Sequence, residues 1–129
     1  MTEEAMTYRE QLPDDCPPFD AGLVEEDRDV FRLVRQSPPT DEDFQSQRAE
    51  KPDAVFNVSE CIARGLSVFT DRRDCERASK LPTLRGRQVC RVRLTPGAGS
   101  IEQTGRPSHH TWWPFAEYAI LPRCVVESK

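Results

Sequence analysis

The sequence lacks most of the features that assign a protein to a class at once. No apolar run approaches the roughly 18–20 residues that cross a bilayer, and the first residues have neither the basic start nor the apolar stretch of a secretory signal. There is no internal repeat and no strict catalytic motif. With 129 residues, the chain is predicted to form one domain without a membrane segment.

Closely spaced cysteines are also missing. The five cysteines are widely and unevenly spaced, with no CxxC or CxxH pair, so a structural zinc site has little basis. Because no signal peptide is recognised, we expect a cytoplasmic protein in which all five thiols are reduced. Cys90 and Cys124 lie in apolar, strand-like contexts and are expected to be small core residues.

Charge is unevenly distributed along the chain. Residues 1–29 carry ten acidic and two basic residues, a net charge of -8, whereas residues 30–129 carry a net charge of +4. Together with three prolines, this composition predicts a weakly structured acidic N-terminal arm over residues 1–29, followed by a single domain over residues 30–129. Residues Arg64–Arg93 hold nine basic against three acidic residues, either a solvated face or a surface for an anionic partner.

Several short segments have the alternation or the β-branched content of strands. The expected strands are Val30–Arg35, Gly65–Phe69, Arg87–Leu94, Ser100–Thr104 and Cys124–Val126. Asp71–Lys80 has helical spacing with Thr70 as its N-cap and Pro82 beyond its end, while Ala54–Ile62 is left open between helix and strand. The pattern predicts an α+β fold with a small mixed or antiparallel sheet of about five short strands and one main helix.

The segment Ser108–Leu121 concentrates hydrogen-bonding and stacking side chains. Both histidines and both tryptophans of the chain lie here, together with an acidic residue and a tyrosine: His109, His110, Trp112, Trp113, Glu117 and Tyr118. We expect an aromatic loop that lines the functional surface, with the histidines as substrate or phosphate contacts rather than metal ligands. Trp112 and Trp113 point to opposite faces if the segment is extended, so one is expected in the core and the other free.

Four segments together resemble a known family. FRLV, GLSVFTD followed by DCERASKLP, the strand RQVCRVRL and finally EYAIL resemble the ADP-ribosyltransferase-like fold over roughly residues 30–127. The resemblance implies that Arg32 holds a dinucleotide, that Ser67 is the hydroxyl of the second strand, and that Glu117 stabilises positive charge on the ribose. It also implies NAD as the cofactor, with Trp112, Trp113 or Tyr118 stacking on nicotinamide.

Three hypotheses for function remain open at this point. The first is a non-catalytic partner-binding or accessory protein, in which the acidic arm docks on a basic protein partner. The second is an NAD-dependent ADP-ribosyltransferase or NAD glycohydrolase, and the third is a nucleic-acid-associated protein that uses the Arg64–Arg93 surface. Convergence of Arg32, Ser67 and Glu117 in one cleft would favour catalysis.

Overall fold

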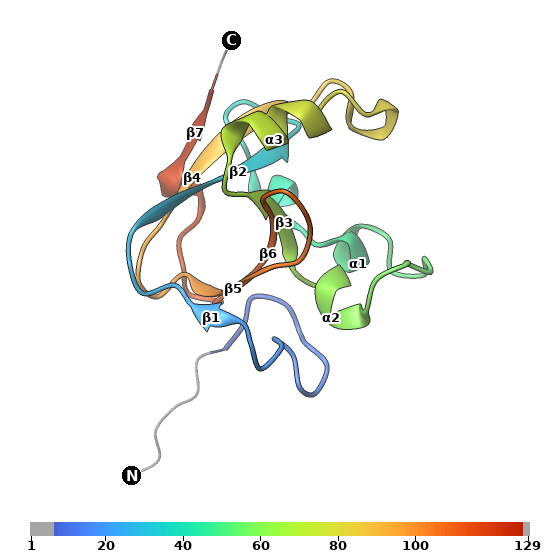
Figure 1. The fold of residues 1–129 in the computed structure, drawn as a ribbon, viewed down its shortest axis with the longest axis vertical. Helices are drawn as coiled ribbons and strands as arrows, with labels where there is room; N and C mark the ends of the chain where they lie inside the picture. The colour runs from blue at the N-terminus through green and yellow to red at the C-terminus, as the bar shows by residue number, and fades with distance from the viewer. Residues whose placement is uncertain (1–6, 128–129) are drawn as a thin grey trace.

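A single curled antiparallel sheet dominates the computed structural model, which describes residues 7–127 (Figure 1). Its strands are β1 (Gly22–Leu23), β2 (Arg28–Val34), β3 (Leu66–Phe69), β4 (Gln88–Leu94), β5 (Gly99–Gln103), β6 (His109–Pro114) and β7 (Cys124–Val126). The spatial order is β1-β5-β6-β3-β2-β4-β7, and every pair of neighbours is antiparallel.

The predicted α+β fold is wrong. The described chain has seven strands rather than about five, and its helices are short rather than organised around one main helix. They are α1 (Gln47–Glu50), α2 (Glu60–Ala63) and α3 (Arg72–Ala78), with 3-10 turns η1 (Asp41–Phe44), η2 (Pro82–Leu84) and η3 (Leu121–Arg123). Two strands were not expected: β1, in the segment predicted to be a weakly structured arm, and β6, in the aromatic segment predicted to be a loop.

Strands β2 and β4 lie side by side at full length. The pair runs from Arg28 opposite Leu94 to Val34 opposite Gln88. Val30, Val34, Val92 and Leu94 are almost fully buried, and they form the centre of the core with side chains from β3 and β6. The β-prone residues of the first strand and the period-two pattern of the second therefore located both strands correctly.

Strand β6 joins the two halves of the sheet. It pairs with β3 on one side and with β5 on the other, so that Thr111 lies opposite both Ser67 and Glu102. Gly99, at the start of β5, has a positive φ of 124° and lies against the backbone of Trp113 and Pro114, where a side chain would not fit.

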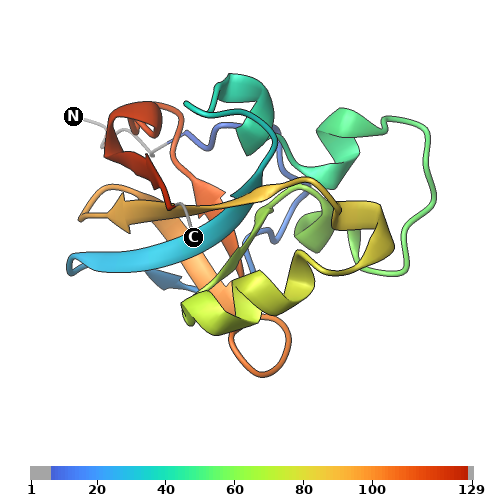
Figure 2. The ribbon, with the colours of Figure 1, turned by 90° about the horizontal axis from the view of Figure 1, so that it is seen from above.

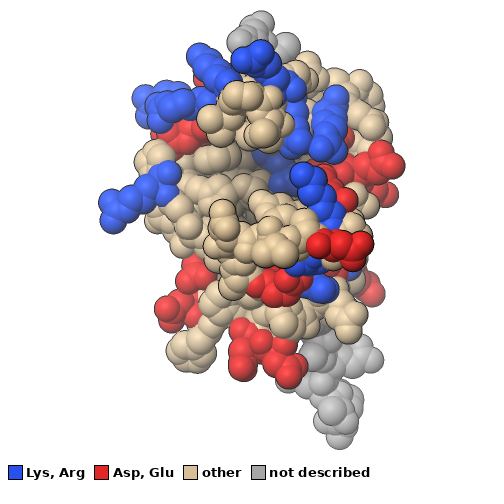
Figure 3. Space-filling view, turned by 90° about the vertical axis from the view of Figure 1, so that its right-hand side faces the viewer, with Lys and Arg blue, Asp and Glu red and all other residues tan. Residues whose placement is uncertain are grey.

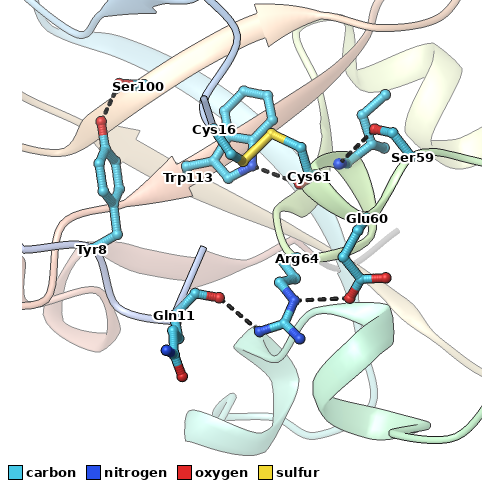
Figure 4. Close-up of a disulfide and its surroundings, with 10 residues drawn as sticks. Tyr8, Gln11, Cys16, Ser59, Glu60, Cys61, Arg64, Ser100 and Trp113 are labelled. Atoms are coloured by element: carbon cyan, nitrogen blue, oxygen red, sulfur yellow. Dashed lines mark hydrogen bonds and ion pairs between the residues drawn. A yellow bond between two sulfur atoms is a disulfide. The ribbon is translucent and has the colours of Figure 1, made fainter. Parts of the chain in front are cut away.

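Both tryptophans of β6 are buried, although one was expected to be free. Trp112 joins the core and donates its indole N–H to the Ala98 carbonyl at 2.9 Å. The Trp113 indole N–H donates at 2.9 Å to the Cys61 carbonyl of α2. The expectation was wrong because α2 and the N-terminal segment cover the second face of β6 (Figure 4).

Helix α3 packs against β2, β3 and β4 (Figure 2). It begins one residue later than expected, since the Asp71 side chain accepts from the Arg73 N–H and is the N-cap in place of Thr70. The Ser108 hydroxyl donates to the buried Asp74 carboxylate at 2.7 Å and thus fixes the start of β6 against α3.

The acidic segment before β2 is attached to the rest of the molecule. A disulfide joins Cys16 to Cys61, so the prediction that all cysteines are reduced is wrong for this pair. Their 45-residue separation in the sequence hid the pairing, whereas Cys75, Cys90 and Cys124 carry free thiols. The Tyr8 hydroxyl also lies 2.8 Å from the Ser100 hydroxyl (Figure 4), and β1 pairs with β5. The division of the chain at residue 29 stays a prediction.

None of the helices within residues 7–127 has the length and the apolar character that a membrane crossing requires.

Candidate functional site: a basic cleft

Strands β2 and β3 diverge after a single residue pair, Phe31 opposite Phe69, and a cleft lies where they part. Helices α1 and α2 and the turn η2 complete its walls, and its volume is about 530 Å³. Figure 3 shows this hollowed face of the molecule, with Lys and Arg side chains gathered above and inside the hollow. We call this feature the basic cleft.

Four cationic side chains line the basic cleft, and one carboxylate opposes them, which leaves a net charge of +3. The cations are Arg32, Arg35, Lys51 and Arg87. The carboxylate, Glu50, lies 3.6 Å from Arg35. Among residues 7–127, no carboxylate oxygen lies within 4 Å of the charged groups of Lys51 or Arg87. The cleft therefore holds more positive charge than its own walls neutralise.

Arg32 forms the inner end of the basic cleft. Its guanidinium donates to three backbone carbonyls, those of Asp43 at 2.9 Å, Ser67 at 2.8 Å and Gln45 at 3.2 Å. Burial lowers the pKa of Arg32 to about 10, with Glu50 opposing the shift and Arg87 adding to it. Arg32 thus fills the gap between the diverging strands and remains cationic near neutral pH.

A line of hydrogen bonds crosses the sheet at the edge of the cleft. Ser67 Oγ lies 2.5 Å from His109 Nε2, and His109 Nδ1 lies 3.0 Å from Thr104 Oγ1. Thr104 Oγ1 in turn lies 2.8 Å from Thr111 Oγ1. Burial lowers the pKa of His109, with neighbouring His110 adding to the shift, so the imidazole is neutral near pH 7.

The positions of these groups are set by the strands that carry them. Ser67 and His109 stand on adjacent antiparallel strands, where Ser67 pairs with Thr111 and His109 with Phe69. The His109 ring also meets the Phe69 ring edge-on, with centroids 5.4 Å apart. Residue 65, just before β3, has to be glycine, because a Cβ there would collide with the Thr111 side chain and lie 3.0 Å from Trp113 Nε1.

The outer wall of the basic cleft is held by an ion-pair cluster. Glu60 in α2 accepts from Arg48 in α1 at 2.8 Å and from Arg64 at 2.8 Å. Hydrogen bonds from Arg48, and next from Arg64, lower the pKa of Glu60 to about 2. The cleft is also lined by apolar side chains, namely Phe56, Val58, Ile62 and, from η2, Leu84. The cleft therefore combines cationic and apolar groups in its lining.

The structure separates the predicted site residues into two groups. Arg32, Ser67 and His109 line the basic cleft, whereas the other five predicted residues lie outside it. His110 donates to the Ser108 carbonyl, and the hydroxyl of Tyr118 is bonded to Thr95 and Arg93. Trp112 and Trp113 are the buried rings described above, and Glu117 is exposed in the turn that follows β6.

Sequence reasoning missed three of the four cations, Arg35, Lys51 and Arg87. They lie in loops or next to strand ends, where no periodic pattern identifies a facing side chain. The available signal was weak: Arg35 and Arg87 flank β2 and β4, which pair in register and so carry both side chains to the same end of the sheet.

The basic stretch Arg64–Arg93 is largely neutralised by its own neighbours. Six of its nine basic residues have a carboxylate oxygen within 4 Å, namely Arg64, Arg72, Arg73, Arg77, Arg91 and Arg93. The other three are Lys80, Arg85 and Arg87, of which Arg87 lines the basic cleft. Only three residues of this stretch therefore contribute positive charge that no neighbouring carboxylate within residues 7–127 balances, fewer than the sequence indicates.

No protein-family model matches the chain, and neither a curated protein nor a solved structure matches it. Within residues 7–127, no three His, Cys, Asp or Glu side chains are grouped so that they could hold a metal ion.

Proposed function

We propose that the protein binds a small phosphate-bearing ligand in the basic cleft. The observation that carries the proposal is the set of four cations around one hollow, three of them without a carboxylate oxygen within 4 Å among the described residues. Guanidinium and ammonium groups are the usual partners of phosphate oxygens. A cleft with a net charge of +3 would attract such an anion before contact.

The shape and lining of the cleft support a nucleotide-sized molecule. Its volume of about 530 Å³ lies within the range of pockets that hold small molecules. Phosphate groups would lie near Arg35, Lys51 and Arg87, while Phe56 and Leu84 offer an apolar wall for a base or another flat group. The resemblance to the ADP-ribosyltransferase-like fold adds NAD to the candidate ligands. The transfer reaction has less support, since Glu117 is not among the cleft residues.

Isothermal titration calorimetry with inorganic phosphate, ADP, NAD and adenosine tests this proposal. We expect ADP or NAD to bind, adenosine to bind far more weakly, and affinity to fall as salt screens the cleft. Arg87→Gln should weaken ADP binding about tenfold, the value of one lost charge-assisted contact.

Arg85→Gln is the matched control. Arg85 is an exposed arginine two residues away that does not line the cleft, and it should leave ADP affinity unchanged. Equal losses in both variants, or equal affinity for ADP and adenosine, would show that the cleft does not recognise phosphate.

A protein partner is the second candidate function, and the acidic segment favours it. Asp14, Asp15, Asp20, Glu25, Glu26 and Asp27 are all exposed. Phe19 stands among them, fully exposed. An anionic surface with an apolar anchor suits a basic protein. Cross-linking in cell extract, compared between the natural chain and Phe19→Ala, would test whether this surface binds a partner.

A further inference from the structure

We propose that Ser67 is a nucleophile activated by His109, so that the basic cleft cleaves a phosphate ester. The inference rests on the proposed phosphate-binding function and adds a reaction to it. It comes from the line of hydrogen bonds between Ser67, His109 and Thr104 at the cleft edge.

The geometry is that of a hydroxyl, a base and a group that orients the base. A serine hydroxyl is a weak nucleophile unless a neighbouring base accepts its proton, and His109 Nε2 is 2.5 Å from Ser67 Oγ. Thr104 Oγ1 can accept the proton on His109 Nδ1 and donate its own proton to Thr111 Oγ1. This arrangement leaves the lone pair of Nε2 directed at Ser67.

Exposure and protonation state agree with the same assignment. Ser67 is exposed in the cleft although it lies in a strand between two buried residues, Leu66 and Val68. His109 is neutral near pH 7, as a general base must be before the reaction. Ser67 therefore faces the cations of the cleft and not the core.

The cations provide what a phosphoryl transfer demands of the protein. Charge spreads over the phosphoryl oxygens in the transition state, and fixed positive groups stabilise it. Arg32 donates to the Ser67 backbone carbonyl at 2.8 Å, which places a cation beside the proposed nucleophile. Arg87 and Lys51 line the same cleft and are free to bind the phosphate oxygens.

The reaction balances in two steps. In the first, Ser67 Oγ forms a bond to phosphorus as the bond to the leaving oxygen breaks, and His109 carries the Ser67 proton to the leaving group. In the second, water attacks phosphorus, His109 removes its proton, and the Ser67–phosphorus bond breaks as the proton returns to Ser67 Oγ. The products are an alcohol and inorganic phosphate.

4-Nitrophenyl phosphate is the probe for this activity. We expect release of 4-nitrophenolate, and after acid quenching we expect peptide mass spectrometry to find phosphate on Ser67. Ser67→Ala should abolish turnover while ADP still binds. His109→Gln should slow turnover at least about 100-fold, the usual contribution of a general base. Ser37→Ala, in an exposed loop outside the cleft, is the control and should have wild-type turnover.

Thr104 is a positioning residue in this scheme. Thr104→Val should lower kcat with little change in KM, and Thr104→Ser should restore kcat because it keeps the hydroxyl.

Two results would overturn the inference and are distinguishable from failure of the binding proposal. If the protein binds ADP but neither releases nitrophenolate nor carries phosphate on Ser67, the cleft binds without catalysis. If Ser67→Ala turns over as fast as the natural chain, the nucleophile is wrong. Absence of both binding and turnover would overturn the phosphate-binding function as well.

Discussion

The two ends of strand β6 differ in how their polar groups are satisfied. At the Trp113 end, each indole N–H has a backbone carbonyl as partner, and a disulfide lies beside the Trp113 ring (Figure 4). At the His109 end, the strand opens on a cleft in which Lys51 and Arg87 have no carboxylate oxygen within 4 Å among the described residues. The indole N–H groups at the Trp113 end are bonded within the protein, whereas the cations at the His109 end are available to bind a ligand. We call the Trp113 end the saturated end.

This difference shows which end of β6 is available for a ligand. The aromatic residues that stand out in the sequence are concentrated at the saturated end, where their polar atoms are already bonded. The cleft instead depends on one or two residues from each of β2, β3 and β6, together with residues from α1, α2, η2 and loops. We therefore expect substitutions at the Trp113 end to change stability, and substitutions at the His109 end to change binding.

The largest effect is expected for Trp112→Ala. The ring is completely buried in the core, and its removal should cost about 4 kcal/mol of unfolding free energy through lost burial and a cavity. Urea denaturation followed by circular dichroism measures it. A loss below about 1 kcal/mol would mean that this end of β6 is not the saturated one.

Removal of the disulfide should have the next largest effect. The bond closes a loop with a sequence separation of 45, and its loss should cost about 3 kcal/mol because the unfolded chain gains freedom. The variant Cys16→Ser with Cys61→Ser is compared with the oxidised protein by urea denaturation and ADP calorimetry. Stability should fall while ADP affinity holds, and a large loss of affinity would show that the two ends are not separable.

The ionisation of His109 is expected to have a smaller effect on the free energy of unfolding. Burial lowers its pKa in the folded state below the ordinary 6.5, so at mildly acidic pH the unfolded chain binds more protons than the folded one. The stability due to this neutral imidazole is complete above about pH 6.5 and declines as the pH falls towards the lowered pKa. His109→Gln should flatten this part of a stability–pH curve from urea denaturation. An unchanged slope would contradict the assignment.

The smallest effect on stability is expected for Arg87→Gln. Arg87 has no carboxylate within 4 Å among the described residues and lies near Arg32, so its removal should change unfolding free energy by less than about 0.5 kcal/mol. Thermal unfolding without ligand, with Arg85→Gln beside it, provides the check. A clear destabilisation would make Arg87 a structural residue and weaken the contrast between the two ends.

The sequence predicts those parts of the fold that depend on local pattern. β-prone residues locate β2 closely, alternation locates β4, and the helix of residues 72–78 is displaced by only one residue at its cap. Strand β6 was missed because its two histidines and its final proline resemble a loop, while its pairing with β3 and β5 comes from distant segments. The fold class was wrong because β6 and β1 were missed and because the predicted main helix is short.

The candidate site shows the same limit. Arg32, Ser67 and His109 were proposed from residue type and order, and they do lie in one cleft. Glu117 was grouped with them, but it lies beyond the far end of β6, and Lys51 comes from a loop with no pattern to mark it. The Cys16–Cys61 bond likewise joins residues separated by 45 positions, so no local pattern in the sequence predicts it.

The place of β6 in the chain also has a consequence for synthesis on the ribosome. Without residues 109–114, the sheet falls into two unconnected parts, β1-β5 and β3-β2-β4-β7. A nascent chain must therefore emerge at least as far as residue 114 before β3 and β5 can be joined. Until then, the facing edges of both are unpaired, so the growing polypeptide exposes two templates for aggregation that a chaperone would have to shield.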